Sequence, residues 1–122
     1  MILGVDHIGF VVNNLKESIE FYNQIGFKLE KTFESPNDKG KAAYLSCGTS
    51  RIEIWQFENI ECSLALIVKN HIGLETNNIN EDIKNILANN GKLLMPITPG
   101  VTVKNKAFAK DENGTVWELI EK

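Results

Sequence analysis

The sequence predicts an α+β fold in which two similar βαβββ modules make up one domain of 122 residues. Three observations predict it: the chain repeats itself once, apolar runs follow the same order in both halves, and each half has one helix-spaced segment that ends near a glycine. The length suits a single domain spanning 1–122, and the composition is ordinary for a globular protein.

The repeat is clearest near the start of each half. Segment 6–10 (DHIGF) matches segment 70–74 (NHIGL), and the same offset places Asn13-Asn14 on Asn77-Asn78. After a slip of one residue, Gly26 falls on Gly91 and, in that shifted register, Glu53 falls on Glu118. Two copies are too few for a solenoid, so we interpret them as a duplicated half-domain with repeats at about 4–59 and 69–122.

In the first half, a β-branched apolar run predicts a buried strand that ends at Asn13-Asn14, residues suited to capping a helix. Leu15, Ile19 and Tyr22 recur at helical spacing, and Gly26 stops the helix. A cluster of turn residues at 35–40 separates the strands that follow. The predicted elements are a strand at 5–12, a helix at 15–24, and strands at 26–34, 42–47 and 51–57.

The second half repeats this order, with Asp111-Glu112-Asn113-Gly114 as its last hairpin turn. Its predicted elements are a strand at 71–76, a helix at 80–90, and strands near 92–95, 104–109 and 115–120. Segment 60–70 joins the halves, and its apolar part, Leu64 to Val68, is longer than a linker needs. The sequence leaves open whether this part packs on the domain or on a partner chain.

Four residues in equivalent positions indicate a metal site. The two histidines of the chain, His7 and His71, each lie near the start of a module's first strand, two residues before a glycine. Glu53 and Glu118 each lie in a module's last strand between large apolar residues. A buried carboxylate is costly without a partner, and one bound cation would explain both. Either glutamate alone would more simply face solvent on a half-exposed strand, but the four-fold coincidence favours a metal site.

The charge pattern argues against nucleic acid as a partner. The net charge is -3, basic residues are dispersed, and Arg51 is the only arginine, whereas phosphate binding needs a clustered basic face. The apolar run at the N-terminus contains Asp6 and His7, which suits neither a signal peptide nor a membrane span. We therefore expect no membrane partner and a cytoplasmic location, with Cys47 and Cys62 as reduced thiols.

The chain resembles the vicinal oxygen chelate (glyoxalase/bleomycin resistance/dioxygenase) superfamily and, within it, glyoxalase I, the lactoylglutathione lyases. The resemblance covers nearly the whole length and rests on these motifs: DHIG at 6–9, SIEFY at 18–22, IEI at 52–54, HIGL at 71–74, and DENG at 111–114 leading to Glu118. It implies a cup-shaped eight-stranded mixed sheet around one divalent metal, held by His7, Glu53, His71 and Glu118. Ni or Co is favoured, with Zn, Mn or Fe possible, and a homodimer is expected.

The resemblance also implies an activity. Glyoxalase I converts the thiol hemithioacetal of methylglyoxal, a small molecule, into a 2-hydroxyacyl thioester by way of an enediolate that the metal stabilises, which detoxifies methylglyoxal. Two imidazoles and two carboxylates leave a divalent cation nearly neutral, with about two positions of an octahedron open to substrate oxygens. Glu118, and by pseudo-symmetry Glu53, would act as both ligand and base in this carbon-sulfur lyase.

Some glutathione-binding features of the family are absent. No arginine follows His7 in its strand, and Gln56 or Phe57 stands where an asparagine is expected. Isolated lysines could meet an anionic substrate but suit a solvated surface better: Lys39, Lys41, Lys104 and Lys106. Trp55 and Trp117 follow or flank the two glutamates in what we take to be equivalent positions. We expect them to pack in the core, although either could instead form a wall of the pocket.

Two alternatives remain open. The first is a metal-dependent epimerase resembling methylmalonyl-CoA epimerase, with the same proton shuttle, although that branch more often has glutamine at the position of Glu53. The second is a non-catalytic protein that binds a drug or another small molecule, whose binding would not depend on metal.

Overall fold

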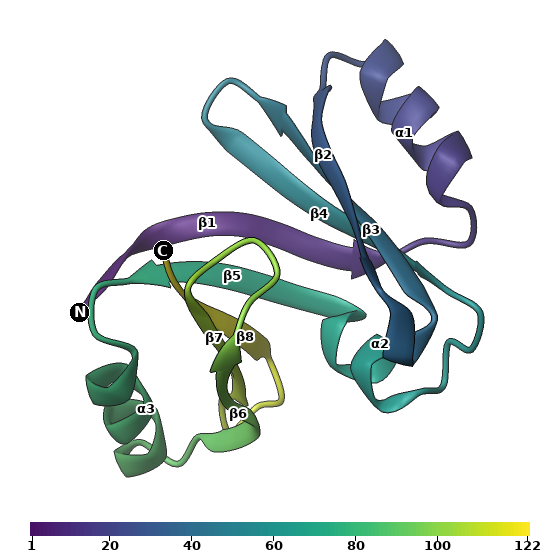
Figure 1. The fold of residues 1–122 in the computed structure, drawn as a ribbon. Coiled ribbons are helices and arrows are strands. Elements are labelled where there is room, and N and C mark those ends of the chain that lie inside the picture. Colours follow the sequence, from purple (N-terminus) through teal and green to yellow (C-terminus); the bar gives the residue numbers. More distant parts are fainter. The chain divides into compact units, whose positions relative to one another are not determined.

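One eight-stranded mixed sheet and three α-helices make up the fold of the computed structural model, which describes all residues from Met1 to Lys122 (Figure 1). The elements are β1 (Ile2–Val11), α1 (Leu15–Gln24), β2 (Lys28–Ser35), the 3-10 turn η1 (Pro36–Asp38), β3 (Gly40–Cys47), β4 (Ser50–Phe57), α2 (Ser63–Val68), β5 (Asn70–Thr76), α3 (Ile79–Ala88), β6 (Lys92–Pro99), β7 (Asn105–Lys110) and β8 (Val116–Glu121). The strand order is β2-β3-β4-β1-β5-β8-β7-β6. The predicted α+β class with an eight-stranded mixed sheet is confirmed.

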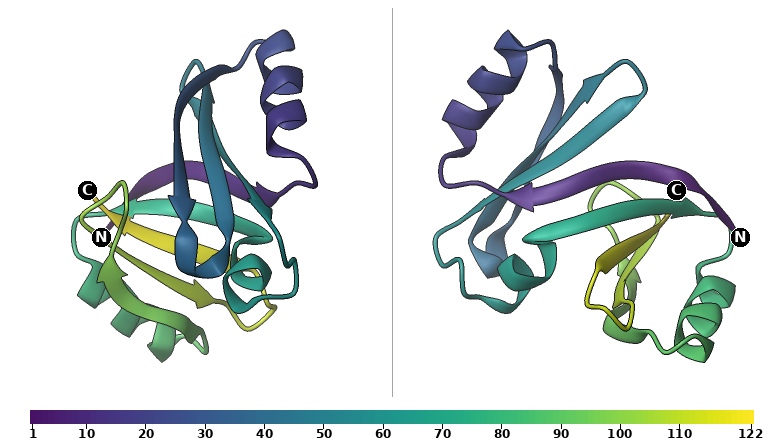
Figure 2. Two further views of the ribbon diagram at one scale, coloured as in Figure 1. Left: turned by 45° about the vertical axis from the view of Figure 1, so that its right-hand side comes forward. Right: turned by 180° about the vertical axis from the view of Figure 1, so that it is seen from behind.

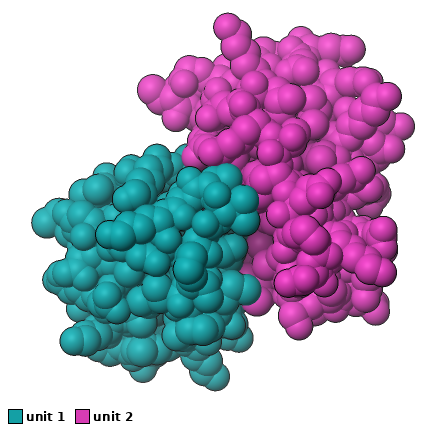
Figure 3. Space-filling model, in the orientation of Figure 1, with its two compact units in different colours: residues 1–6, 71–122 teal, residues 7–70 magenta.

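The chain divides into two compact units (Figure 3). Unit 2 contains residues 7–70, and unit 1 contains residues 71–122 together with residues 1–6. Strand β1 therefore contributes its first residues to unit 1 and the remainder to unit 2.

Strand pairing follows the same plan in each unit, as the views in Figure 2 allow the reader to trace. In unit 2, β1 runs parallel to β4 with Gly9 opposite Glu53, and β2, β3 and β4 pair antiparallel. In unit 1, β5 runs parallel to β8 with Gly73 opposite Glu118, and β6, β7 and β8 pair antiparallel. The repeat in the sequence is thus also a repeat in strand register.

The two long helices begin with identical caps. The Asn14 side chain accepts a hydrogen bond from the backbone N–H of Glu17 at 3.0 Å, and Asn78 accepts one from Glu81 at 3.1 Å. Each cap satisfies one of the N–H groups that a helix start leaves without a partner. Helix α1 has the predicted bounds, whereas α3 runs from 79 to 88 instead of from 80 to 90.

The slip of one residue between the repeats lies at the ends of these helices. Behind α1, Gly26 has a φ of +117°, which favours glycine. Behind α3, Asn90 takes the left-handed conformation at a φ of +67°, and Gly91 follows it. A Cβ at Gly91 would lie 2.8 Å from the carbonyl oxygen of Ile86, so the chain can pass there only as glycine.

Each unit has its own apolar core between its helix and its strands. In unit 2, α1 packs through Leu15, Ile19 and Tyr22 against strand residues that include the fully buried Leu45 and Ile54. In unit 1, α3 packs through Ile79, Ile83 and Ile86 against strand residues that include Ala107 and Leu119. The helical spacing of these apolar residues is what buries one face of each helix.

The apolar part of segment 60–70 forms the short helix α2, which the sequence reading missed. Leu64, Ala65 and Val68 are buried, which answers the open question, because they pack within their own chain. A helix of six residues is too short to display the 3.6-residue periodicity that identified α1 and α3. None of the helices has the length and apolar content needed to cross a membrane.

Candidate metal centre

In unit 2, the predicted ligands His7 and Glu53 lie next to each other on β1 and β4. The two strands are parallel, and Gly9 stands directly opposite Glu53 with no side chain to crowd it. His7 is two residues before Gly9 and therefore points to the same face. Its Nε2 lies 3.9 Å from Oε1 of Glu53.

Unit 1 contains the same arrangement on β5 and β8. Gly73 stands opposite Glu118, and His71 precedes this glycine by two residues. The distance from His71 Nε2 to Glu118 Oε1 is 3.5 Å. Each unit therefore provides one imidazole nitrogen beside one carboxylate.

All four side chains are removed from solvent. His7, Glu53, His71 and Glu118 have exposed fractions of 1%, 3%, 2% and 6%. Removing a charged carboxylate from water costs on the order of several kcal/mol, unless a nearby opposite charge compensates for the lost hydration. Imidazole nitrogens and carboxylate oxygens are a donor set that suits Zn, Mn, Fe, Co and Ni. Each unit thus contributes a buried histidine–glutamate pair whose atoms could help to hold a metal ion.

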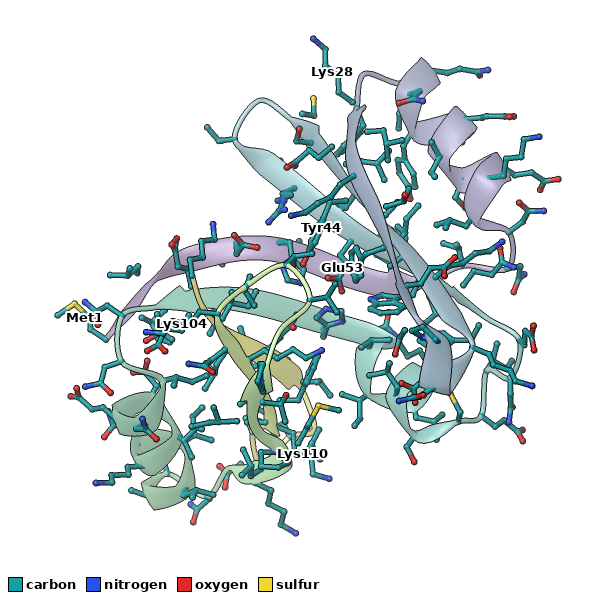
Figure 4. All side chains as sticks on the ribbon, in the orientation of Figure 1. Met1, Lys28, Tyr44, Glu53, Lys104 and Lys110 are labelled. Atoms are coloured by element: carbon teal, nitrogen blue, oxygen red, sulfur yellow. The ribbon has the colours of Figure 1, made fainter.

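Each histidine–glutamate pair has an aromatic neighbour that the sequence reading missed. Tyr44 on β3 stands opposite Glu53, and the His7 and Tyr44 rings meet edge to face with centroids 5.6 Å apart; Tyr44 and Glu53 are labelled in Figure 4. Phe108 on β7 stands opposite Glu118, and the His71 and Phe108 rings meet in the same way at 5.7 Å. The sequence contained this signal, because Ala43-Tyr44 matches Ala107-Phe108 at the original offset of 64 residues, but the shifted register used for Gly26 and Glu53 hides the match.

A hydrogen bond from Trp55 distinguishes the two carboxylates. Trp55 lies two residues after Glu53 on the same face of β4, and its indole Nε1–H donates to Glu53 Oε1 at 2.7 Å. The residue two after Glu118 is Ile120, whose side chain has no hydrogen to donate. The indole donor that Glu53 has two residues along its strand therefore has no counterpart at position 120.

Trp55 and Trp117 are not equivalent, contrary to the sequence reading. Trp117 precedes Glu118 by one residue and so lies on the opposite face of its strand, where it is partly exposed and its indole lies 3.4 Å from Asp111 Oδ2. Side chains alternate along a strand. Trp55, two residues from Glu53, therefore shares the face of Glu53, whereas Trp117, one residue from Glu118, lies on the face opposite to Glu118.

Among the lysines considered for an anionic substrate, Lys106 is half-buried and stands opposite Ile120, on the face of the strands that also carries Glu118, whereas the others lie on the surface. Lys39 is exposed and forms an ion pair with Glu58 at 3.8 Å, and Lys41 and Lys104 are also exposed. The side chain of Gln56 accepts a hydrogen bond from the backbone N–H of Leu15 at 2.7 Å. Gln56 therefore holds the start of α1.

The comparison with protein families gives a match along residues 4–119, to the model of the Glyoxalase/Bleomycin resistance protein/Dioxygenase superfamily. The chain belongs to this superfamily. The predicted superfamily is thus confirmed, although the match does not distinguish its glyoxalase I branch from others. A search of the curated proteins found no match.

Solved structures of similar fold agree with membership of this superfamily. Hypothetical protein BH1468 from Bacillus halodurans C-125 is 26% identical, with a TM-score of 0.81 over 97% of this chain and 93% of that one. A methylmalonyl-CoA epimerase from Mycobacterium tuberculosis is 17% identical, with a TM-score of 0.82 over 98% and 88%. A methylmalonyl-CoA epimerase in complex with methylmalonyl-CoA is 20% identical, with a TM-score of 0.83 over 100% and 96%.

The two epimerases are similar to this chain in fold, and at these identities the likeness shows the fold alone. None of these three structures is named as a glyoxalase I, so that branch of the superfamily is not confirmed.

Proposed function

We propose that the protein is a metal-dependent enzyme that removes a proton from a carbon next to a carbonyl group and returns one, and that its reaction is the epimerisation of an acyl thioester. The observation that carries this proposal is the pair of buried histidine–glutamate sites in equivalent positions. The thioester substrate is favoured by the likeness in fold to methylmalonyl-CoA epimerases.

His7, Glu53, His71 and Glu118 would hold the metal together. When bound, a divalent cation supplies Lewis acidity that stabilises negative charge on a substrate oxygen. The metal's identity stays a prediction, with Co or Ni favoured and Zn, Mn or Fe as alternatives.

Glu118 is the better candidate for the proton acceptor. Trp55 donates a hydrogen bond to Oε1 of Glu53, which occupies that oxygen and fixes the orientation of the carboxylate. Glu118 has Ile120 at the position equivalent to Trp55, so its carboxylate receives no indole donation from that position. A carboxylate oxygen of Glu118 would take the proton from one face of the substrate carbon. Inversion would follow when that carbon takes a proton from water on its opposite face, and Glu118 would then release its proton to the solvent.

A second candidate is the isomerisation of a methylglyoxal hemithioacetal, as in glyoxalase I. A specific feature favours it: position 53 is a glutamate, whereas the epimerases of the superfamily more often have glutamine there. Both reactions start by removing a proton next to a carbonyl, so the same buried groups would serve either.

The decisive experiment offers both substrates to one metal-loaded preparation. In D2O, NMR should show deuterium entering the C2 position of methylmalonyl-CoA, and the exchange should stop after chelation. If the protein instead forms a 2-hydroxyacyl thioester from methylglyoxal and a thiol, and no deuterium enters methylmalonyl-CoA, the second candidate is supported. Metal-independent binding of these compounds without turnover would overturn both and support a binding protein.

Matched variants test the roles of the carboxylates. Glu118→Gln should abolish the exchange of deuterium. The control is Glu121→Gln, which makes the same change three residues along β8, at a side chain that accepts a hydrogen bond from Asn105. This control should leave the exchange intact. If Glu118→Gln retains both metal content and turnover, the proposed site is wrong.

A further inference from the structure

Unit 1 contains a cavity that plays no part in the proposed reaction. Its volume is about 360 Å³, within the range of small-molecule sites. It lies between α3 and the strands of its unit, with apolar walls from Ile2, Leu74, Ile86, Trp117 and Leu119. All of these residues belong to unit 1.

The cavity lies on the other face of these strands from the proposed metal ligands. On β5, Leu74 is three residues after His71, and on β8, Trp117 and Leu119 flank Glu118. Since side chains alternate, residues an odd number of positions apart point to opposite faces. A molecule in the cavity would therefore not approach the metal ligands of unit 1.

Comparison with the other repeat explains why the space is present. In unit 2, the Phe10 and Phe27 rings meet the Tyr22 ring edge to face, at centroid distances of 6.3 Å and 5.5 Å. The repeat aligns these three aromatic residues with smaller or exposed ones in unit 1, namely Leu74, Ile86 and Lys92. Unit 1 thus keeps the helix and the strands but lacks the three rings that fill the equivalent region.

One carboxylate at the cavity has no cation paired with it. Asp82 and Asp111 line the cavity together with the amides of Asn85 and Asn89, but Asp82 forms an ion pair with the N-terminal ammonium at 3.4 Å, which leaves Asp111 as the source of negative charge. Asp111 Oδ2 lies 3.4 Å from the indole Nε1 of Trp117, so a carboxylate stands at the edge of an aromatic wall. Such a combination attracts an ammonium group, which the carboxylate and the ring face both stabilise, and repels an anion.

We propose that this cavity binds a small molecule made of one aromatic ring with a short ammonium-bearing side chain. The ring would occupy the space that aromatic residues fill in unit 2, against Leu74, Ile86 and Trp117. The ammonium group would face Asp111. This site is independent of the proposed reaction, whose thioester substrates are anionic.

The test uses three probes of equal size and different charge: phenethylamine, 2-phenylethanol and phenylacetate. Two-dimensional NMR of the ¹⁵N-labelled full chain reports on the indole N–H groups of Trp117 and Trp55, which are the only two tryptophans. Phenethylamine should shift the Trp117 signal saturably and leave the Trp55 signal in place. The neutral alcohol should bind about tenfold more weakly, and phenylacetate should not bind.

Two variants refill the cavity with residues of the other repeat. Ile86→Tyr copies Tyr22, Leu74→Phe copies Phe10, and each should abolish the Trp117 shift without lowering the melting temperature. Leu87→Tyr adds the same ring at a neighbouring position of α3 that is 51% exposed, and it should leave binding unchanged. Having two filling variants keeps the test valid if one of them fails to fold.

Three results would overturn the proposal. One is the absence of a Trp117 response to phenethylamine at millimolar concentration. Another is equal binding of phenethylamine and phenylacetate, which would remove the role of the Asp111 carboxylate. The third is a dimer in sedimentation experiments that becomes monomeric in both filling variants, because a second copy of the chain would then occupy the cavity.

Discussion

At the scale of single residues, Trp55 makes the two buried carboxylates unequal. The repeat gives Glu53 and Glu118 the same place beside a histidine, at similar nitrogen–oxygen distances of 3.9 and 3.5 Å. Only Glu53 accepts an indole hydrogen bond from the residue two positions further along its strand. An enzyme that uses one carboxylate mainly as a ligand and the other as a base needs such a difference.

Replacing Trp55 with phenylalanine tests this role. The variant keeps most of the apolar surface but removes a hydrogen bond to a buried charged group, so the free energy of unfolding should fall by about 1 to 3 kcal/mol. Metal affinity should also fall, because Glu53 is no longer held. Chemical denaturation and metal titration measure the two effects. Trp117→Phe is the control, since Trp117 lies on the opposite face of its strand, and it should leave metal affinity unchanged.

At the scale of elements, the β7–β8 turn depends on the charge of Asp111. The backbone N–H of Thr115 is the main group that holds the pKa of Asp111 below its ordinary value of 3.8, and the Trp117 indole and the N–H of Asn113 add to it. The unfolded chain binds a proton more readily than the folded turn. The turn's contribution to stability is therefore complete above the ordinary pKa and is lost as the pH falls through the lower folded pKa.

Asp111→Asn should accordingly flatten the acid limb of the stability curve. The amide cannot titrate, so the difference in unfolding free energy between wild type and variant should shrink as the pH falls below about 3.8, the ordinary carboxyl value. Denaturant titrations between neutral and strongly acidic pH measure this difference. A difference that stays constant with pH would contradict the assignment.

The helix caps predict equal effects in the two units. Asn14→Ala and Asn78→Ala each remove the hydrogen bond that the cap accepts from the first turn of a ten-residue helix, and each should cost about 0.5 to 2 kcal/mol of unfolding free energy. Asn78→Ala also removes a donation to the exposed Glu81 side chain at 3.3 Å, which adds little at the surface. Asn→Asp at either position keeps the accepting oxygen and should restore most of the loss. If one alanine variant loses far more unfolding free energy than the other, the two helices contribute unequally to the stability of their units.

How far the sequence predicts each element depends on how long its periodic pattern runs. Helix α1 was predicted with its observed bounds because Asn14 and Gly26 mark its ends and three apolar residues mark its face. Strand β6 extends to Pro99, well beyond the predicted end near 95, and its register shifts on both sides of Met95. An irregular strand has no steady alternation, so its end could not be located from the pattern.

At the scale of the whole molecule, the repeat made the site residues predictable and also limited the prediction. His7, Glu53, His71 and Glu118 stood out because each has a counterpart, and the structure places each histidine beside the glutamate of its own unit. Trp55 was misassigned because its role depends on a feature that the repeat does not share. The homodimer stays a prediction. So does the division of one domain into repeats at about 4–59 and 69–122.

The proposal of one shared metal makes a prediction about the entire chain. If both pairs hold the same ion, the protein should bind one equivalent per chain, and His7→Ala and His71→Ala should each abolish tight binding. Metal at about 100 times its Kd should then stabilise the wild type by about 2.7 kcal/mol, and neither variant should respond. Elemental analysis gives the stoichiometry, and thermal unfolding with and without chelator gives the stabilisation. Two equivalents per chain, with one retained in each variant, would instead mean that each unit binds its own ion.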